Sequence, residues 1–254
     1  MIGFGTYKLN DELPDLIPVA IESGCRLFDT AEFKFNIEKI AEGIKKTGLK
    51  REEFKIIYRV CNYKLPPKLH LDEILAKTGL EYFDYLLLYH RDKNDKWVNI
   101  YRHIRDYKHK IKCGTANFGI KDLMEFKTNF SCYPDINQFE SNPYFQQRDL
   151  INFCAENNIK IFTNTILARG RVFQDSRIIE LSEKYNSTPS EFLLNFYNNE
   201  LLNPIFSSKN PEHIRMVFNS EFNGKIKTED LIEFEKINQP EDNGRVTRQC
   251  LINS

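Results

Sequence analysis

A carboxylate with two candidate partners stands near the start of the chain. The stretch FDTAEFKFN, residues 28–36, runs from a strand-like segment that carries Asp29 to Lys34, which is flanked by two phenylalanines. A buried carboxylate is costly unless a cation or a hydrogen-bond donor faces it. Lys34 and Arg59, which lies near the end of the next strand-like segment, are the candidate partners, singly or together.

The next strand-like segments end in further polar side chains. His90 closes the fourth segment, Asn117 follows the fifth and Gln138 lies in the sixth. Taken alone, a strand-end Asp often caps the next helix, and a single His more often belongs to the core. Because an acid, a base and two amides occur together at successive strand ends, a functional pocket is the better interpretation.

The elements that must position these residues alternate along the chain. Short runs rich in β-branched and aromatic residues predict strands, and longer stretches of helical periodicity separate them. Several of these stretches stop at a glycine, which suits the left-handed end of a helix. The predicted strands are residues 2–7, 25–30, 54–60, 82–90, 109–116, 135–140, 159–165 and 203–208, and the predicted helices include 13–24, 36–48, 69–79, 96–107, 148–158 and 176–186.

Eight strands alternating with helices in about 250 residues predict a (β/α)₈ TIM barrel. A doubly wound sheet is the alternative, but its dinucleotide fingerprint is incomplete, because GFGTYK has Lys8 where the third glycine of GxGxxG belongs. No Pro-rich or Gly/Ser-rich linker divides the chain. We therefore expect one domain over residues 1–254.

Composition excludes several classes of function. Lys and Arg number 36 and Asp and Glu number 36, so neither nucleic acid nor a membrane surface is an expected partner. The six cysteines form no CxxC pair and no cluster at metal-ligand spacing, which predicts reduced thiols and no metal site. No leader-like segment and no long apolar run is present, so we expect a cytoplasmic protein. No apolar stripe beyond the barrel's own helices indicates an oligomer interface.

Several motifs occur in the order and at the spacing of a known family. They are GFGTYKL, ESGCRLFDTA, YLLLYH, GTANF, NQFESNPYFQQRDLINFC and TPSEFLL. Together they resemble the aldo-keto reductase family over nearly the whole chain. The resemblance implies a (β/α)₈ barrel, NADP(H) as cofactor and a small carbonyl compound as ligand. The chain opens directly on the first predicted strand, so we expect the barrel to lack the family's usual N-terminal hairpin.

The resemblance implies four catalytic positions. Members of the family use an Asp, a Tyr, a Lys and a His, with the Tyr protonating the carbonyl oxygen as hydride arrives. Asp29 and His90 match this pattern, but Lys34 stands in place of the Tyr and Arg59 in place of the Lys. Ordinary reductase activity is therefore in doubt.

The chemistry of the two replacements differs. Arg59 stays protonated and can hold Asp29 but cannot relay protons. Desolvation and the nearby guanidinium should lower the pKa of Lys34, which we expect to lie between two aromatic rings, while Asp29 opposes that shift. Such a lysine could act as a general acid or as an amine nucleophile. The alternative is that Lys34 points into solvent from a loop.

The implied cofactor site is also altered. Thr6 lies in the first motif, and Asn117 and Gln138 occupy the positions that hold the nicotinamide carboxamide. Asn164 replaces the aromatic residue that stacks on the nicotinamide ring. The two cations that bind the 2′-phosphate are replaced by Ser207 and His213, and Ser208 is retained. We therefore expect NADP or NAD to bind weakly or not at all, with little preference between them.

Two classes of function follow from these observations. The first is an enzyme acting on carbonyl compounds with an altered proton donor. The second is a non-catalytic barrel, a pseudoenzyme kept as a binding or regulatory protein. Retention of Asp29, His90, Asn117 and Gln138 favours a functional pocket.

Overall fold

The computed structural model describes residues 1–61, 67–92, 96–107, 111–199, 202–220, 226–239 and 244–245. Eight parallel strands form one sheet in the order β7-β6-β5-β4-β3-β2-β1-β8. A parallel bridge between Thr163 and Pro204 joins β7 to the segment before β8 and brings the sheet close to a closed barrel. The strands are β1 (Gly3–Gly5), β2 (Leu27–Ala31), β3 (Lys55–Val60), β4 (Tyr85–Leu88), β5 (Lys112–Ala116), β6 (Ile136–Glu140), β7 (Lys160–Asn164) and β8 (Ile205–Phe206).

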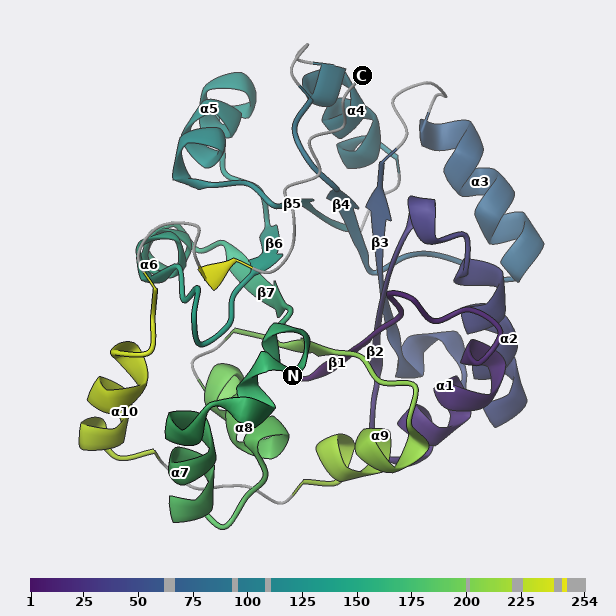
Figure 1. The fold of residues 1–254 in the computed structure, drawn as a ribbon. Helices are drawn as coiled ribbons and strands as arrows, with labels where there is room; N and C mark the ends of the chain where they lie inside the picture. Colours follow the sequence, from purple (N-terminus) through teal and green to yellow (C-terminus); the bar gives the residue numbers. More distant parts are fainter. Residues whose placement is uncertain are drawn as a thin grey trace.

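Helices surround these strands (Figure 1). They are α1 (Leu13–Glu22), α2 (Ile37–Thr47), α3 (Pro67–Thr78), α4 (Lys96–Arg105), α5 (Ile120–Phe130), α6 (Arg148–Glu156), α7 (Ser176–Lys184), α8 (Pro189–Asn199), α9 (Pro211–Phe218) and α10 (Thr228–Glu235). Three 3₁₀ segments, η1 (Glu32–Lys34), η2 (Arg51–Glu53) and η3 (Ala168–Gln174), lie in the connections.

The predicted (β/α)₈ barrel is confirmed, and the doubly wound alternative is wrong. All eight predicted strands form, although the fourth is shorter than predicted and ends at Leu88, before His90. The three helices expected to stop at glycine do so, and Gly24, Gly48 and Gly79 all have positive φ. Helices α5, α8, α9 and α10 are not among the helices predicted from the sequence.

The barrel interior is filled by apolar side chains from alternate strand positions. Strand side chains point alternately to the two faces, so inward residues recur at every second position. Gly114 on β5 allows β6 and the Leu87 side chain to approach closely. A Cβ at position 114 would lie 2.4 Å from the Ile136 carbonyl oxygen and 2.9 Å from Leu87 Cδ2. The buried residues of this inner cluster are Leu27, Ile57, Tyr85, Leu87, Ile136, Phe162 and Ile205.

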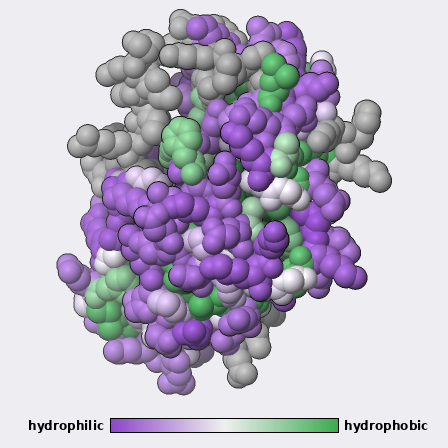
Figure 2. Space-filling view, turned by 90° about the vertical axis from the view of Figure 1, so that its right-hand side faces the viewer, coloured by the Kyte–Doolittle hydropathy of each residue, from purple (hydrophilic) through white to green (hydrophobic). Residues whose placement is uncertain are grey.

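The outer surface is mainly hydrophilic on the face drawn in Figure 2, with small hydrophobic areas scattered over it. Among the described residues, no helix is long and apolar enough to cross a membrane. Nor do three or more His, Cys, Asp or Glu side chains among the described residues come together in a group that could hold a metal ion. The five described cysteines are free thiols.

Candidate active site

The side chains that point into the barrel are apolar in its middle and become polar at one end. Two residues after an inner-cluster residue, β2 presents Asp29, β3 presents Arg59 and β6 presents Gln138. In β7 and after β8, Asn164 and Ser207 take the corresponding positions. All of these residues lie toward the carboxyl ends of parallel strands, the end at which barrel enzymes place their chemistry. We call this end the mouth.

Asp29 stands at the centre of a buried network. Its Oδ2 accepts a hydrogen bond from Arg59 Nη2 at 2.7 Å and is 3.5 Å from Lys34 Nζ. Its Oδ1 accepts a hydrogen bond from Gln138 Nε2 at 3.0 Å. Both predicted partners therefore bind Asp29, and Gln138 is a third partner that the sequence did not predict. We call these four residues the Asp29 cluster.

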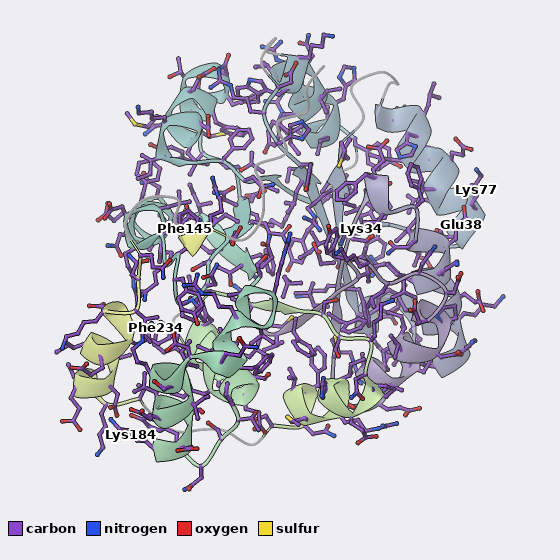
Figure 3. The ribbon with its side chains drawn as sticks, in the orientation of Figure 1. Lys34, Glu38, Lys77, Phe145, Lys184 and Phe234 are labelled. Carbon is purple, nitrogen blue, oxygen red and sulfur yellow. The ribbon has the colours of Figure 1, made fainter. Side chains whose placement is uncertain are left out.

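Lys34 reaches the cluster from η1, the short turn after β2. Its side chain is only 5% exposed, so the alternative in which it points into solvent is wrong. Phe35 ends the turn in a left-handed conformation at φ 50° and is 85% exposed. Lys34 therefore does not lie between two aromatic rings as expected. In Figure 3 it lies among the strands, whereas Lys77 and Lys184 lie at the periphery.

The environment of Lys34 makes its ammonium group easier to deprotonate than that of an exposed lysine. The pKa of Lys34 is lowered to about 8: burial is the main cause, the Asp29 carboxylate opposes the shift, and the Arg59 guanidinium adds to it. This balance agrees with the expectation from the sequence. A neutral amine is therefore more accessible at Lys34 than at an exposed lysine.

Aromatic rings connect the Asp29 cluster to His90. The Tyr89 ring lies 5.4 Å from the Arg59 guanidinium carbon, and its centroid is 5.0 Å from the Phe33 ring and 5.5 Å from the His90 ring. His90 follows β4 at the mouth and is half-buried. Burial lowers the pKa of His90, with Asp92 opposing the shift, so the ring is neutral around pH 7.

Glu32 fixes the turn that carries Lys34, and the sequence analysis missed it. The Glu32 carboxylate is buried; it accepts a hydrogen bond from the Cys61 amide at 2.7 Å and lies 3.1 Å from His70 Nε2. The same His70 nitrogen is 3.2 Å from the Tyr58 hydroxyl. These contacts join η1 to the end of β3 and to α3. The sequence does show a glutamate two residues before Lys34. Its burial could not be predicted, because it depends on where α3 places His70.

The residues expected to hold a nicotinamide carboxamide are close to this network. Gln138 uses its Nε2 on Asp29, and its Oε1 is buried and accepts no hydrogen bond from the described residues. Asn117 has a left-handed backbone and donates its Nδ2 to the Tyr89 carbonyl oxygen at 3.0 Å. The Thr6 hydroxyl donates to the Asp29 carbonyl oxygen at 2.9 Å, a contact between β1 and β2. Gln138 Oε1 is suited to accept a hydrogen bond from a carboxamide NH₂ group.

The remaining predicted cofactor residues are not joined to the Asp29 cluster by a described contact. Asn164 accepts a hydrogen bond from the Thr165 hydroxyl at 2.9 Å. Ser207 is exposed, and Ser208 receives the Asn210 amide on its hydroxyl at 3.0 Å. His213 is exposed on α9. Lys209, which the sequence analysis did not consider, lies beside these serines and pairs with Glu12 at 2.7 Å.

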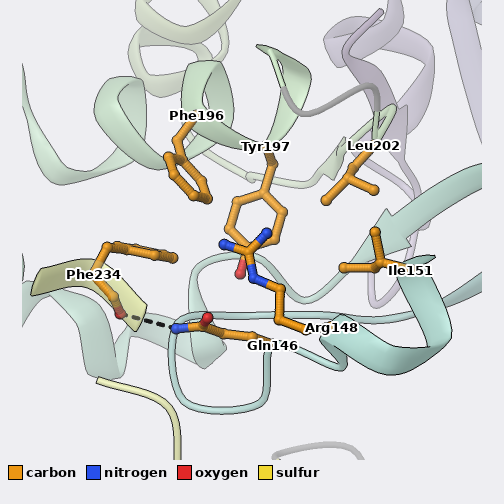
Figure 4. A pocket seen from close by; sticks show the side chains of 7 residues that line it. All are labelled: Gln146, Arg148, Ile151, Phe196, Tyr197, Leu202 and Phe234. Atoms are coloured by element: carbon orange, nitrogen blue, oxygen red, sulfur yellow. Dashed lines mark hydrogen bonds between the residues drawn. The ribbon is translucent and has the colours of Figure 1, made fainter. Parts of the chain in front are cut away.

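A small hollow lies outside the Asp29 cluster, between α6, α8 and α10 (Figure 4). A hydrogen bond of 2.9 Å from Gln146 Nε2 to the Phe234 carbonyl oxygen crosses one side of it. Its lining residues are Gln146, Arg148, Ile151, Phe196, Tyr197, Leu202 and Phe234. No predicted site residue lines this hollow, so we assign it to helix packing.

Comparison with known proteins gives a consistent family. The model of the Aldo/keto reductase family matches residues 1–239. A methylglyoxal reductase of Escherichia coli K12 is 30% identical over 247 residues, which cover 94% of this chain and 89% of the relative. A glyoxal reductase of Bacillus subtilis is 27% identical over 249 residues, which cover 94% and 89% of the two chains.

Solved structures agree on the fold. An aldo-keto reductase from a deep-sea metagenome library superimposes with a TM-score of 0.87 at 24% identity, covering 94% of this chain and 92% of the other. A point mutant of Gox0644 in complex with NADPH gives a TM-score of 0.88 at 23% identity, covering 97% and 92%.

Loss of Arg59 should destabilise the protein far more than loss of an exposed cation. Arg59→Met removes a charge-assisted hydrogen bond from the buried Asp29 carboxylate, which Lys34 and Gln138 continue to face, and this costs about 1.5–3 kcal/mol of unfolding free energy. The control is Lys77→Met, because Lys77 forms an ion pair with Glu73 at 57% and 61% side-chain exposure, and such pairs contribute about 0–1 kcal/mol. Urea denaturation measures both variants. If both variants lost the same unfolding free energy, the Asp29 cluster would have to be solvated by water, which would contradict its burial.

Lys34 should make stability depend on pH above neutrality. Its pKa of about 8 in the folded protein is below the ordinary value of 10.5, so between these values the unfolded chain binds more protons and the folded state gains stability as pH rises. Relative to Lys34→Met, wild-type protein should gain on the order of 2 kcal/mol between about pH 7.5 and 10. Urea denaturation of both proteins at each pH measures this gain. If the difference in unfolding free energy between the two proteins stayed the same at every pH, the lowered pKa of Lys34 would be contradicted.

Proposed function

The chain belongs to the aldo/keto reductase family, and on this basis we propose that it is an NADP(H)-linked oxidoreductase that acts on small carbonyl compounds in the cytoplasm. The observation that carries the proposal is the buried Asp29 cluster at the mouth, where Lys34 and Arg59 share one carboxylate. Relatives named for methylglyoxal and glyoxal support a small substrate. The free thiols among the described cysteines suit a reducing compartment.

Lys34 is the proposed proton donor. A general acid works best when its pKa is near the working pH, and the pKa of Lys34 is lowered to about 8. Arg59 keeps its proton and pairs with Asp29 at 2.7 Å. Asp29 in turn keeps the Lys34 ammonium in place. The neutral His90 ring, reached through Tyr89, is suited to donate a hydrogen bond to the carbonyl oxygen and so orient the substrate.

Gln138 and Asn117 are the proposed holders of the nicotinamide carboxamide. The buried Gln138 Oε1 offers an acceptor that the described residues do not use. When bound, the nicotinamide supplies the hydride. At the other end of the cofactor, Ser207, Ser208 and His213 provide hydrogen bonds but no permanent charge. The cofactor is therefore proposed to bind weakly, with little preference for the 2′-phosphate form.

A non-catalytic barrel remains the second candidate function. Arg59, which cannot relay a proton, and the uncharged phosphate positions favour it. The Asp29 cluster argues against it. Burying a carboxylate and two cations costs desolvation free energy, and a ligand-binding role for the pocket would explain why the three charges are retained. A binding or regulatory role would retain ligand affinity without turnover.

Restoring the two phosphate cations should create a preference for NADPH. Ser207→Lys together with His213→Arg adds two charge-assisted contacts, each contributing about 1.5–3 kcal/mol, or at least tenfold in affinity. NADH affinity should change little because NADH lacks the 2′-phosphate. Titration calorimetry with both nucleotides measures the effect. Wild-type protein that already prefers NADPH a hundredfold would show that another cation, Lys209 first, holds the phosphate.

Wild-type protein should reduce methylglyoxal slowly with NADPH, and Lys34→Met should lower the rate by about 10²–10⁴-fold, the usual contribution of a general acid. Lys34→Tyr combined with Arg59→Lys should raise the rate, because it restores a phenol and a lysine at the positions implied by the family. NADPH absorbance measures turnover, with Lys77→Met as the control that leaves it unchanged. An unaffected Lys34→Met rate would assign the proton to another group, and Tyr89, whose ring lies 5.4 Å from the Arg59 guanidinium carbon, is the phenol to test first.

A further inference from the structure

Lys34 differs from the peripheral lysines in having a buried amine next to a second cation. Lys77 and Lys184 each pair with one carboxylate, and the hydrogen bond to that carboxylate raises the pKa of each. Lys34 instead shares Asp29 Oδ2 with Arg59, which is closer to it, at 2.7 Å against 3.5 Å. Arg59 therefore takes most of the carboxylate's attraction.

We propose that Lys34 is also a covalent binding site, where its amine captures small aldehydes as a reversible imine. This inference rests on the carbonyl pocket of the proposed function and extends it. The ligand class is a short aldehyde, because the Lys34 side chain is only 5% exposed. Phe33, which precedes Lys34 in the chain, and Tyr89, whose ring lies 5.4 Å from the Arg59 guanidinium carbon, have ring centroids 5.0 Å apart and are the proposed apolar contacts for its carbon chain.

The reaction balances within the site. The Lys34 ammonium first releases one proton to water. The neutral amine then adds to the aldehyde carbon: the C–N bond forms as the C=O π bond breaks, and a proton moves from nitrogen to oxygen to give a neutral carbinolamine. Water returns one proton to the carbinolamine hydroxyl, the C–O bond breaks as the nitrogen lone pair forms the C=N bond, and a water molecule leaves. The resulting iminium nitrogen carries the same single positive charge as the original ammonium.

Charge conservation makes this product compatible with the Asp29 cluster. Before and after the reaction, one positive group at the Lys34 position and the Arg59 guanidinium face one carboxylate. No additional charge is buried, so the step avoids the desolvation cost of a new buried ion. Hydrolysis by the reverse route releases the aldehyde and restores the lysine.

Reductive trapping tests the proposal without any nicotinamide. Wild-type protein is incubated with dilute acetaldehyde and cyanoborohydride at pH 7.5, and peptide mass spectrometry measures the rate of ethylation at each lysine. The expected result is that Lys34 is ethylated at least tenfold faster than Lys77 and Lys184. Ethylation of Lys34 no faster than these two exposed lysines would overturn the proposal.

Two variants separate imine chemistry from mere accessibility. Arg59→Gln removes the second cation but keeps the amine, so it should slow ethylation of Lys34 at least threefold relative to Lys77 in the same sample. Lys34→Arg keeps a cation beside Asp29 and should abolish labelling at position 34 while the rates at Lys77 and Lys184 stay the same. An unchanged Lys34 rate in Arg59→Gln would count against the proposal.

A parallel sample that contains NADPH and acetaldehyde but no cyanoborohydride keeps this proposal distinct from the reductase proposal. Ethylation of Lys34 without NADPH oxidation would support capture and contradict the reductase function. NADPH-dependent reduction of acetaldehyde without preferential labelling of Lys34 would support the reductase and contradict capture.

Discussion

The structure of the mouth depends on one buried carboxylate. Asp29 takes a guanidinium and an ammonium on one oxygen and an amide on the other, from β3, η1 and β6. Removing the carboxylate would leave two cations facing each other with little water to separate them, which proteins avoid. The cluster carries one excess positive charge, and Lys34 is the member that can lose it, because a guanidinium keeps its proton.

The surrounding structure holds Lys34 against this carboxylate rather than letting it reach water. Phe35 adopts a left-handed conformation that ends η1, and its ring is exposed while the Lys34 side chain turns inward. Glu32 joins the same turn to the end of β3 and to His70 on α3. A left-handed aromatic residue is uncommon and indicates that its surroundings impose the conformation. The chemistry of the site therefore depends on a local turn and on barrel packing together.

Sequence reasoning predicted the parts of this arrangement that follow from strand order. Alternation within strands, together with strand ends that meet at one edge, was enough to bring Asp29 and Arg59 together. It could not predict the contact of Gln138 with Asp29, because these residues are 109 positions apart and meet only once the barrel interior is formed. The sequence left the direction of the Lys34 side chain open between Asp29 and solvent, because a lysine in a turn can take either direction with the same local pattern. Glu32 was missed because its burial requires the position of α3.

The central claim is that Lys34 is a desolvated amine that shares the Asp29 carboxylate with Arg59. The most direct measurement is an NMR titration of protein labelled with ¹³C at lysine Cε, with the Lys34 resonance assigned by its loss in Lys34→Arg. The account predicts that this resonance titrates near the pKa of about 8, apart from the other lysines. Titration together with the exposed lysines, near their ordinary value of about 10.4, would contradict the account.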